Sequence, residues 1–446
     1  MSRSIVPSRR RFLGTGAAAA AGGLVPAFPW TSRAFANVAA NDRPRIGCIG
    51  TGSMGTGDAH AHAHFGDILA VCDVDDRHSS RAREDGHIGK GKADAYRDYR
   101  KVLERSDIDV VSIVTTDHWH VKIAVEALQA GKHVFCQKPL SLTLEENRLC
   151  RAAAEKYPKQ VFFIGTQQRS QKDQFLRAVN MVHKGLLGPI KKVTVGINGS
   201  PTGGPFPVAE PPKELDWNMW LGQAPEVPFR EKRCHYEFRW WYEYSGGKFT
   251  DWGAHHVDIA QWALREDTKG KGPTTIDGSD VKHPVPFKDG WPTQDDSYNT
   301  AHDFAVKCLF PSGVEMVIDS RSDNGVLFEG EKGRMFVNRE KCTGKPIEEN
   351  WDKDQFTDAD VQTLYKGKPF EGHKENFYRC IREGGLPVSD VYSHIMAMNT
   401  CHLASIAGRL GRKITWDPAA EKITGDEQAA GLAARTPRKG FEIPRV

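Results

Sequence analysis

The chain has 446 residues, of which 39% are hydrophobic and 26% charged, a composition typical of a globular protein with more than one core. No run of the sequence approaches the roughly 20 apolar residues that a membrane-spanning helix needs. The formal net charge is +4, but the first 36 residues hold five arginines and no acid, so the remainder has one more acidic than basic residue. This balance gives no electrostatic reason to expect nucleic acid or an anionic membrane as a partner.

The first 36 residues carry the features of an export signal. Ser8–Leu13 reads SRRRFL, a twin-arginine pattern, and a Gly/Ala-rich apolar stretch follows from Gly14 to Val25. Ala34-Phe35-Ala36 is a small-x-small cleavage site. We therefore expect residues 1–36 to be a twin-arginine signal peptide and the protein to be periplasmic, exported in folded form. A disordered basic tail is the alternative.

The nine cysteines are odd in number, scattered along the chain and without a CxxC pair. Cys48, Cys72 and Cys136 lie inside apolar, strand-like runs. We expect these thiols to be small buried core residues and not a disulfide framework. This expectation fits a protein that folds in the reducing cytoplasm before export.

A dinucleotide fingerprint follows the first predicted strand, Arg45–Ile49. The next six residues, Gly50–Gly55, read GTGSMG, in which glycines allow a tight turn, close backbone approach to a pyrophosphate, and helix-on-strand packing. A second strand, Ile68–Cys72, ends at Asp73, at the spacing expected of the acid that binds the adenosine ribose. An acid there repels a 2′-phosphate, so NAD is favoured over NADP, although Arg77 lies nearby.

Three alternating histidines, His60, His62 and His64, lie in the predicted helix after the fingerprint. His60 and His64 are four residues apart and could face one metal ion. No carboxylate or cysteine of matching geometry is evident nearby, so a solvated helix face is the preferred interpretation and no metal site is expected.

The stretch from Val110 to Leu144 predicts the active site. Val110–Val114 and His133–Cys136 read as buried strands, and Val121–Gln129 has the apolar spacing of a helix. Polar clusters follow both strands: a loop at Thr116–His120 and then Gln137-Lys138-Pro139. Ligands of open α/β sheets bind just outside the carboxyl ends of the strands. Lys138 is therefore predicted to lie in a site.

The rest of the chain predicts a second part with a different architecture. We expect a Rossmann domain over residues 44–166, an open, mainly antiparallel sheet domain with helices over 167–415, and a wrapping tail over 416–446. The elements expected outside the stretch above are an α/β unit over Ala93–Arg105, helices over Glu145–Lys156, Phe175–Lys184, Glu375–Arg382 and Ser393–Leu410, strands over Val161–Gly165, Ile190–Asn198 and Tyr298–Asp319, and a hairpin over Val326–Asn338.

A second polar cluster follows Gly246-Gly247. Asp251 and His255 are four residues apart and would share one face of a helix, with Asp258 on the same side. A carboxylate that orients an imidazole is the usual way to make a general base that works near neutral pH. The alternative is a helix capped by Thr250 or Asp251, with the histidines packed in the core.

With these motifs the chain resembles the Gfo/Idh/MocA oxidoreductases, named for glucose–fructose oxidoreductase and inositol dehydrogenase. The markers are Gly50–Gly55, Thr116–His120, Gly131–Val134 leading into Gln137-Lys138-Pro139, and the Gly246–Asp258 segment. The resemblance implies a Rossmann domain followed by an open antiparallel sheet that carries the substrate and often the oligomer interface. A homo-oligomer is therefore expected.

The resemblance also implies roles for single residues. Lys138 matches the lysine that holds the nicotinamide and the reacting hydroxyl, His255 the proton-transferring histidine, and Asp251 its partner. Gln137 stands where the family usually has glutamate, which removes a charge beside Lys138. The expected cofactor-binding residues are Gly50, Gly52, Ser53, Met54, Gly55, Asp73, Thr115, Trp119, His120, Gln137, Lys138 and Gln167, and the expected substrate-binding residues are Arg169, Arg239 and His255.

Taken together, these features predict an NAD(P)-dependent oxidoreductase that acts on the CH–OH group of a sugar. Trp217, Trp220, Trp240 and Trp241 offer aromatic faces for a sugar ring, or core packing instead. Export without a periplasmic NAD pool implies a tightly bound cofactor and a redox-neutral cycle. An NAD-dependent glycosidase, which oxidises, eliminates, hydrates and reduces, is the first alternative, and a catalytically silent NAD- or sugar-binding protein is the second.

Overall fold

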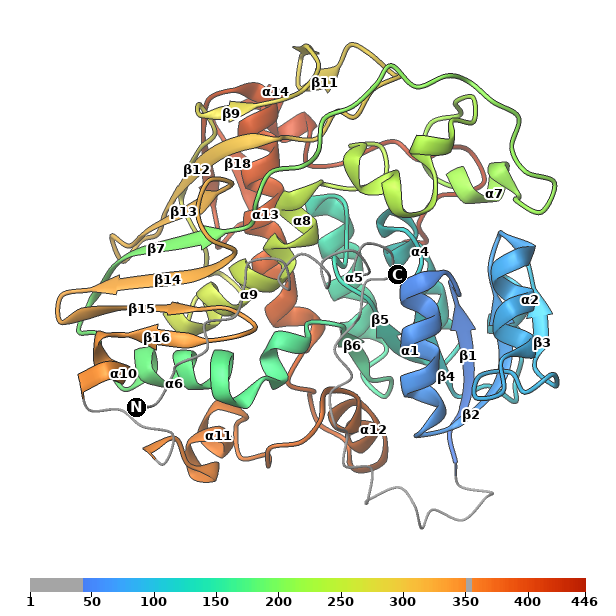
Figure 1. Cartoon of the computed structure of the whole chain (residues 1–446), viewed down its shortest axis with the longest axis horizontal. Helices are drawn as coiled ribbons and strands as arrows, with labels where there is room; N and C mark the ends of the chain where they lie inside the picture. Colours follow the sequence, from blue (N-terminus) through green and yellow to red (C-terminus); the bar gives the residue numbers. More distant parts are fainter. Residues whose placement is uncertain (1–42, 350–354) are drawn as a thin grey trace, which may run out of the picture. The chain divides into compact units, whose positions relative to one another are not determined.

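Two main β-sheets organise the part of the chain that the structure, a computed structural model, describes: residues 43–349 and 355–446. The predicted signal peptide, residues 1–36, lies outside these residues. Both sheets belong to one compact unit (Figure 1). The predicted fold class, a Rossmann domain followed by a largely antiparallel sheet with helices, is confirmed.

The first sheet has six parallel strands in the order β3-β2-β1-β4-β5-β6. The strand order reverses between β1 and β4, and this reversal leaves a crevice outside their carboxyl ends. All strands predicted for this half are present. They are β1 (Arg45–Ile49), β2 (Asp67–Cys72), β3 (Asp94–Tyr96), β4 (Val110–Ile113), β5 (His133–Cys136) and β6 (Phe162–Ile164).

The helices of this half follow the strands and cover the sheet. They are α1 (Ser53–Ala63), α2 (Asp76–Glu84), α3 (Arg100–Leu103), α4 (Asp117–Gln129) and α5 (Leu144–Lys156). The prediction of a loop at Thr116–His120 is wrong. Thr116 is the extended residue that precedes α4, and Asp117–His120 form its first turn with buried side chains. Tertiary burial of Trp119 and His120 here outweighs the polar composition that suggested a loop.

The second sheet has ten strands, and all neighbours are antiparallel except β7 and β13. Its path runs β16-β15-β14-β7-β13-β12-β8-β17-β18, with β9 paired to β12. The strands are β7 (Ile190–Gly196), β8 (Thr275–Asp277), β9 (Val281–Lys282), β12 (Asp303–Leu309), β13 (Glu315–Asp319), β14 (Gly325–Gly330), β15 (Gly333–Val337), β16 (Cys342–Gly344), β17 (Lys413–Asp417) and β18 (Lys422–Thr424). A small separate hairpin joins β10 (Phe287–Lys288) and β11 (Trp291–Pro292).

The helices of the second half are mostly short, apart from two that fill the interior. The short ones are α6 (Arg177–His183), α7 (Trp217–Leu221), α8 (Lys248–Asp251), α10 (Lys345–Glu349), α11 (Asp358–Leu364), α12 (His373–Glu383) and α14 (Glu427–Gly431). The predicted helix over Phe175–Lys184 begins as a π-helical turn, Lys172–Leu176, and continues as α6. The other two, α9 (Gly253–Leu264) and α13 (Val391–Leu410), are buried along almost their whole lengths.

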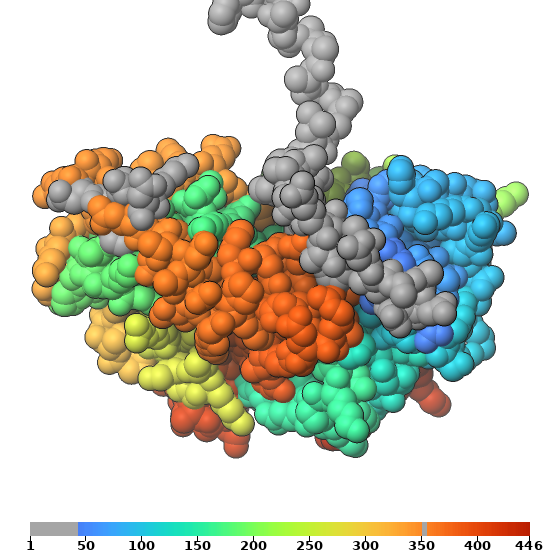
Figure 2. All heavy atoms as spheres, turned by 90° about the horizontal axis from the view of Figure 1, so that it is seen from below, coloured from blue at the N-terminus to red at the C-terminus, as the bar shows by residue number. Residues whose placement is uncertain are grey.

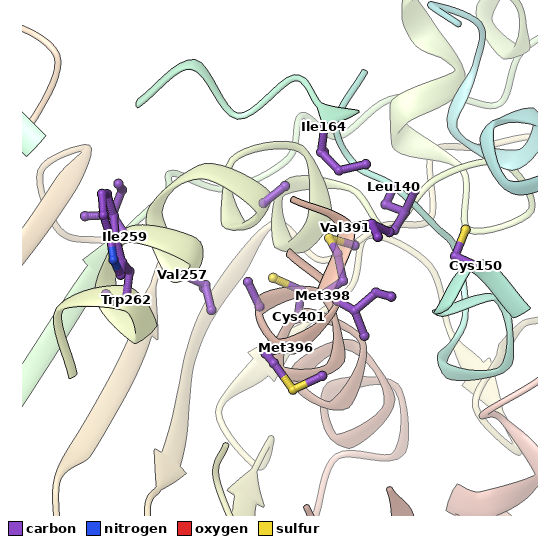
Figure 3. Close-up of a cluster of buried hydrophobic side chains, with 14 of the residues drawn as sticks. Leu140, Cys150, Ile164, Val257, Ile259, Trp262, Val391, Met396, Met398 and Cys401 are labelled. Atoms are coloured by element: carbon purple, nitrogen blue, oxygen red, sulfur yellow. The ribbon is translucent and has the colours of Figure 1, made fainter. Parts of the chain in front are cut away.

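The hydrophobic core is continuous between the two halves. Figure 3 shows Val257 of α9 and Met398 of α13 in one cluster with Leu140 and Ile164 of the first half. All four side chains are fully buried. Because buried apolar area contributes about 25 cal/mol per Å², this shared core holds the two sheets in a defined relation.

Helix α12 strengthens the same junction from another side. The Tyr378 hydroxyl and the His62 imidazole of α1 share a 2.7 Å hydrogen bond. The ammonium of Lys374 pairs with Asp58. Figure 2 shows the orange residues of this region beside the blue and teal residues of the first half. The helix therefore ties α1, which follows the glycine fingerprint, to the second half of the chain.

A wrapping tail was predicted over residues 416–446, but these residues do more than wrap the surface. Residue 416 lies inside β17, so the sheet extends through β18 before the chain returns to the first half. There the Lys122 ammonium donates to the carbonyl of Glu442 at 2.7 Å, and Phe441 packs edge-on against Trp119. The end of the chain thus stabilises α4.

Within the described ranges, every helix is too short or too polar to cross a membrane.

Close packing of the backbone explains why the fingerprint needs glycine at position 55, and this explanation can be tested. A Cβ at Gly55 would lie 2.0 Å from the carbonyl oxygen of Gly50, whereas a Cβ at exposed Gly57, two residues further along α1, meets nothing within 4 Å. We expect Gly55→Ala to lower the free energy of unfolding by about 1–3 kcal/mol because the turn must shift. Gly57→Ala should raise it by about 0.5–1 kcal/mol through helix propensity. Denaturant unfolding of the two variants measures both; equal stabilities would contradict this packing.

Candidate active site

A cavity of about 540 Å³ lies at the carboxyl ends of β1, β4 and β5, where the strand order of the first sheet reverses. The structure brings most of the sequence-predicted cofactor residues to its walls. These are Gly50, Gly52, Ser53, Met54, Gly55, Asp73, Thr115, Trp119, His120, Gln137 and Lys138, with Arg239 of the predicted substrate set.

One end of the cavity fits a pyrophosphate. Gly52 precedes α1 in an extended conformation and caps it with no side-chain hydrogen bond, and the first turn holds no acid. The first-turn N–H groups are therefore available to an anion. Gly50 has φ +83°, and a Cβ there would lie 2.5 Å from the carbonyl oxygen of Val114. The missing Cβ thus lets the fingerprint loop pack directly against the backbone that follows β4.

The adenosine end is organised by Asp73. Its carboxylate accepts hydrogen bonds from the N–H groups of Thr51 at 2.8 Å and Asp75 at 3.0 Å. His78 lies 3.4 Å from the same carboxylate, and this hydrogen bond raises the pKa of its imidazole against the opposing effect of burial. The carboxylate is held against the fingerprint loop, where the ribose hydroxyls of NAD would lie.

Three potential metal ligands, Asp75, His78 and His235, lie together beside this end, with ligand atoms within 4.8 Å of one another. Arg77 already pairs with both oxygens of the Asp75 carboxylate, at 2.8 and 2.5 Å. The guanidinium therefore neutralises the only acid of the group. His60, one of the alternating histidines, pairs with Asp85 at 3.0 Å instead.

A segment of the second half, Leu215–Ser245, covers the cavity. It is fastened at the β2 side, where the Asp216 N–H donates to the carbonyl of Val74 at 2.9 Å. It is fastened at the α4 side by Trp119, whose indole N–H donates to the carbonyl of Trp220 at 3.0 Å. Figure 1 shows α7, part of this covering segment, above the parallel sheet. The cavity is therefore roofed by residues far from the fingerprint in sequence.

The tryptophans of the covering segment mostly pack with one another and with neighbouring aromatic residues. Trp217 stacks on Trp220 with ring centroids 4.7 Å apart, and Trp241 is fully buried with the Arg233 guanidinium 3.9 Å from its ring. Only Trp220 of the four lines the cavity. The core interpretation therefore holds for Trp240 and Trp241, since neither reaches the cavity.

At the opposite end from the adenosine site, Lys138 meets Asp251. The Lys138 ammonium donates to the Asp251 carboxylate at 2.9 Å and to its backbone carbonyl at 3.0 Å. Burial would raise the pKa of Asp251, but the charges of Lys138 and Arg239 outweigh burial and hold it well below its usual value. An ammonium has three N–H donors, so one remains to face a ligand in the cavity.

The predicted pairing of Asp251 with His255 is wrong. The helix breaks at Trp252, because α8 ends at Asp251 and α9 begins at Gly253, so the two residues do not share a continuous face. The Asp251 carboxylate turns to Lys138, Arg239 and Lys248 instead.

His255 is buried next to this centre but does not line the cavity itself. Burial first, and then the charge of Lys138, lowers the pKa of His255 well below its usual value. Its Nδ1 has no hydrogen-bond partner among the described residues. The imidazole is therefore neutral near pH 7 and able to accept a proton. The pH profile of the activity should show no inflection from His255 near neutral pH.

Two predicted ligand contacts are not supported by the geometry. Arg169, expected to bind substrate, is buried and forms a bidentate ion pair with Asp258 at 2.6 and 2.9 Å. Gln167, expected near the cofactor, begins a short 3₁₀ turn (Gln167–Ser170) and does not line the cavity. We correct the role of Arg169 to a structural one, because its charge is already satisfied by Asp258.

Gln137, which stands in place of the usual glutamate, has a clear partner. Its amide N–H donates to the Asp58 carboxylate at 2.6 Å, and Asp58 also pairs with Lys374. A second carboxylate at position 137 would face Asp58 across this distance and repel it. The glutamine therefore suits its neighbour, while Asp251 supplies the counter-charge of Lys138.

Asp117, which was not predicted as a site residue, lines the cavity as the first residue of α4. The Ser245 hydroxyl donates to its carboxylate at 2.6 Å. Burial raises the pKa of Asp117 to about 7. The only available signal was an acid directly after a strand end, which does not reveal burial. Asp117 is thus the carboxyl of this site that changes its charge near neutral pH.

This pKa has a consequence for stability. A carboxyl whose pKa is raised by folding contributes stability below its unfolded value near 4, and this contribution is lost as pH rises through about 7. We expect Asp117→Asn to gain stability relative to the parent between pH 5 and pH 8, by about 1–4 kcal/mol. Denaturant unfolding at the two pH values measures this gain. Exposed Asp323→Asn is the control, and a pH-independent difference for Asp117→Asn would refute the assignment.

Comparisons with known proteins agree with this geometry. The model of an oxidoreductase family with an NAD-binding Rossmann fold matches residues 44–165. The model of the corresponding C-terminal alpha/beta domain matches residues 179–443, more than half of the chain.

Among curated proteins, the chain is 33% identical over 155 residues to an alpha-N-acetylgalactosaminidase of Shewanella oneidensis, and the match covers 33% of each chain. It is 30% identical over 206 residues to a glycosyl hydrolase family 109 protein of Shewanella pealeana, covering 41% of this chain and 44% of that one. The chain therefore spans less than half the length of these relatives.

Solved structures share the fold at low identity. A WlbA dehydrogenase of Bordetella pertussis, in complex with NADH and UDP-GlcNAcA, has a TM-score of 0.59 at 18% identity and covers 84% of this chain and 98% of its own. An aldose-aldose oxidoreductase of Caulobacter crescentus has a TM-score of 0.58 at 18% identity, with 84% and 99% covered. From its family matches, its sheet order and its glycine-lined cavity, the chain belongs to the Gfo/Idh/MocA family of NAD-binding oxidoreductases.

Proposed function

We propose that the protein oxidises a CH–OH group of a sugar at Lys138 and His255, with a tightly held NAD that is regenerated in the same site. The observation that carries this proposal is the arrangement at the end of the cavity. One N–H of Lys138 is free to face a ligand, and the charge of Lys138 acts on the buried, neutral imidazole of His255. NAD, when bound, supplies the hydride acceptor in one direction and the hydride donor in the other.

The chain's own residues handle the proton. Lys138 holds the reacting hydroxyl oxygen by a hydrogen bond and stabilises the negative charge that develops there. His255 accepts the hydroxyl proton as the C–H hydride leaves, which converts the alcohol to a carbonyl. In the return step His255 gives the proton back to the oxygen. Asp251 positions the Lys138 ammonium through its 2.9 Å hydrogen bond.

Tight binding follows from the roof over the cavity. The covering segment Leu215–Ser245 is attached to both sides of the crevice, which would slow the release of a bound dinucleotide. The predicted twin-arginine export would carry such a cofactor across the membrane inside the folded protein. We therefore include periplasmic localisation in the proposal and favour NAD over NADP because Asp73 faces the ribose position.

A closed redox cycle has a second version in this site, an NAD-dependent glycosidase. It oxidises C3, removes the C2 proton, eliminates the aglycone, adds water and reduces C3 again. The partial similarity to glycosyl hydrolase family 109 proteins favours this version. Asp117 favours it too, because the extra proton transfer needs a second acid–base group that titrates near neutral pH.

We also propose a homo-oligomer formed through the second sheet. Alternate residues of β12 are buried against the interior, and Leu309 on this strand is 45% exposed. Light scattering should give a mass above that of one chain; a monomer at all concentrations would refute this part.

The proposal is tested on purified mature protein without added cofactor. We expect about one NAD(H) per chain to be released on denaturation and little on dialysis. Incubated with nitrophenyl glycosides, a glycosidase releases nitrophenol with no net NADH. An oxidoreductase instead converts a sugar pair to a lactone and a polyol. Cofactor that leaves freely on dialysis would contradict the trapped cofactor, and neither product from any sugar would favour a silent binder.

A further inference from the structure

Four cationic side chains surround one carboxylate at the reacting end of the site. Asp251 lies 2.9 Å from the ammonium of Lys138, 3.6 Å from Arg239 and 3.8 Å from Lys248. A fourth cation, Arg339, interacts electrostatically with both Asp251 and His255. These side chains come from four separate parts of the chain, so the cluster is a product of the fold.

The cluster carries more positive than negative charge. Across residues 43–349 and 355–446, Asp251 is the only carboxylate within 4.0 Å of any of the four cationic groups. The nearby carboxyl of Asp117 has a pKa of about 7 because of burial and is only partly ionised at neutral pH. Four positive charges therefore share little more than one negative charge.

Three of the four cations are held in a poorly solvated place. The side chains of Lys138, Lys248 and Arg239 are 14%, 16% and 21% exposed. Burial lowers the pKa of Lys248 against the opposing charge of Asp251, and the charges of Lys138 and Arg239 lower it further. Uncompensated charge in such surroundings is costly unless an anion binds beside it.

The cofactor does not account for all of this charge. Its pyrophosphate would be held at the fingerprint loop by the free N–H groups of the first turn of α1. Lys248 and Arg339 do not line the cofactor cavity. Arg339 lies exposed in the turn between β15 and β16. Its guanidinium lies 4.7 Å from the ring of Trp252, which immediately precedes α9, the helix of His255. Both cations interact with Asp251, the partner of Lys138, so they lie toward the Lys138 end of the site and not at the pyrophosphate end.

From this arrangement we infer that the sugar substrate carries an anionic group, a carboxylate or a sulfate or phosphate ester, which Lys248 and Arg339 bind while Lys138 holds the reacting hydroxyl. This inference rests on the proposed function and narrows its substrate class. Guanidinium and ammonium groups bind such oxyanions through charge-assisted hydrogen bonds, which are about twice as strong as neutral ones. A neutral sugar would leave the excess positive charge around Asp251 uncompensated.

The test compares charged and neutral sugars on the NAD-loaded protein. Methyl glucuronide, glucose 6-sulfate and glucose 6-phosphate are titrated against methyl glucoside by calorimetry, and reduction of the bound cofactor is followed with each. We expect at least one anionic sugar to bind about tenfold or more tightly than the neutral glycoside. The preferred sugar separates the carboxylate from the ester as the bound group.

Two variants test which side chains cause the preference for an anionic sugar. Arg339→Gln and Lys248→Gln should each reduce the binding of the anionic sugar about tenfold and leave binding of the neutral one nearly unchanged, with NAD content intact. Lys341→Gln is the matched control, because Lys341 lies in the same turn but faces the ring of Phe336. The NAD content of each variant reports its folding.

The outcomes separate the inference from the proposed function. Equal binding and oxidation of charged and neutral sugars would overturn the inference and leave the proposed function standing. Binding of an anionic sugar that depends on Arg339 but never reduces the cofactor would support the inference and count against the proposed function. Binding of none of these sugars would overturn the inference.

Discussion

The ion pair between Lys138 and Asp251 is the interaction on which the site depends. Lys138 follows β5 of the parallel sheet, and Asp251 ends α8 in the second half of the chain, 113 positions later. The pair therefore joins the cofactor side of the site to the substrate side. It also fixes where the free N–H of the ammonium points, because two of its three donors are already engaged with Asp251.

The surrounding structure holds this pair in place and limits its exposure to solvent. The shared core of α9 and α13 holds the two sheets together, and the covering segment closes the crevice above the fingerprint. Low solvent access strengthens each electrostatic interaction at the centre. The same burial keeps His255 neutral and places the pKa of Asp117 near 7. One property, exclusion of water, thus sets the protonation states that the proposed chemistry needs.

The sequence predicts the fold well because its signals are local. Strands β1, β2, β4 and β5 and the glycine fingerprint can be identified from short apolar runs and from glycines at fixed spacing. Lys138 can be placed because strand ends of a parallel sheet meet at one edge. Most predicted cofactor residues consequently line the cavity.

The errors concern side-chain partners, which depend on tertiary contacts. A spacing of four residues suggested that Asp251 serves His255, but the helix breaks at Trp252 and the carboxylate turns to Lys138. Arg169 was predicted to bind substrate, but its guanidinium forms an ion pair with Asp258. The raised pKa of Asp117 and the excess of cations near Asp251 arise from burial and from the meeting of distant segments, which no local pattern reveals.

The most direct test of the central claim is rapid mixing of the NAD-loaded protein with substrate sugars, followed at 340 nm. The account predicts absorbance from a reduced nicotinamide, up to one equivalent per chain, and its decay as the cycle closes. Lys138→Ala should lose this signal at least a hundredfold in rate while keeping its fold and its bound cofactor. A full signal in Lys138→Ala, or no signal with any sugar that binds, would contradict hydride transfer at this centre.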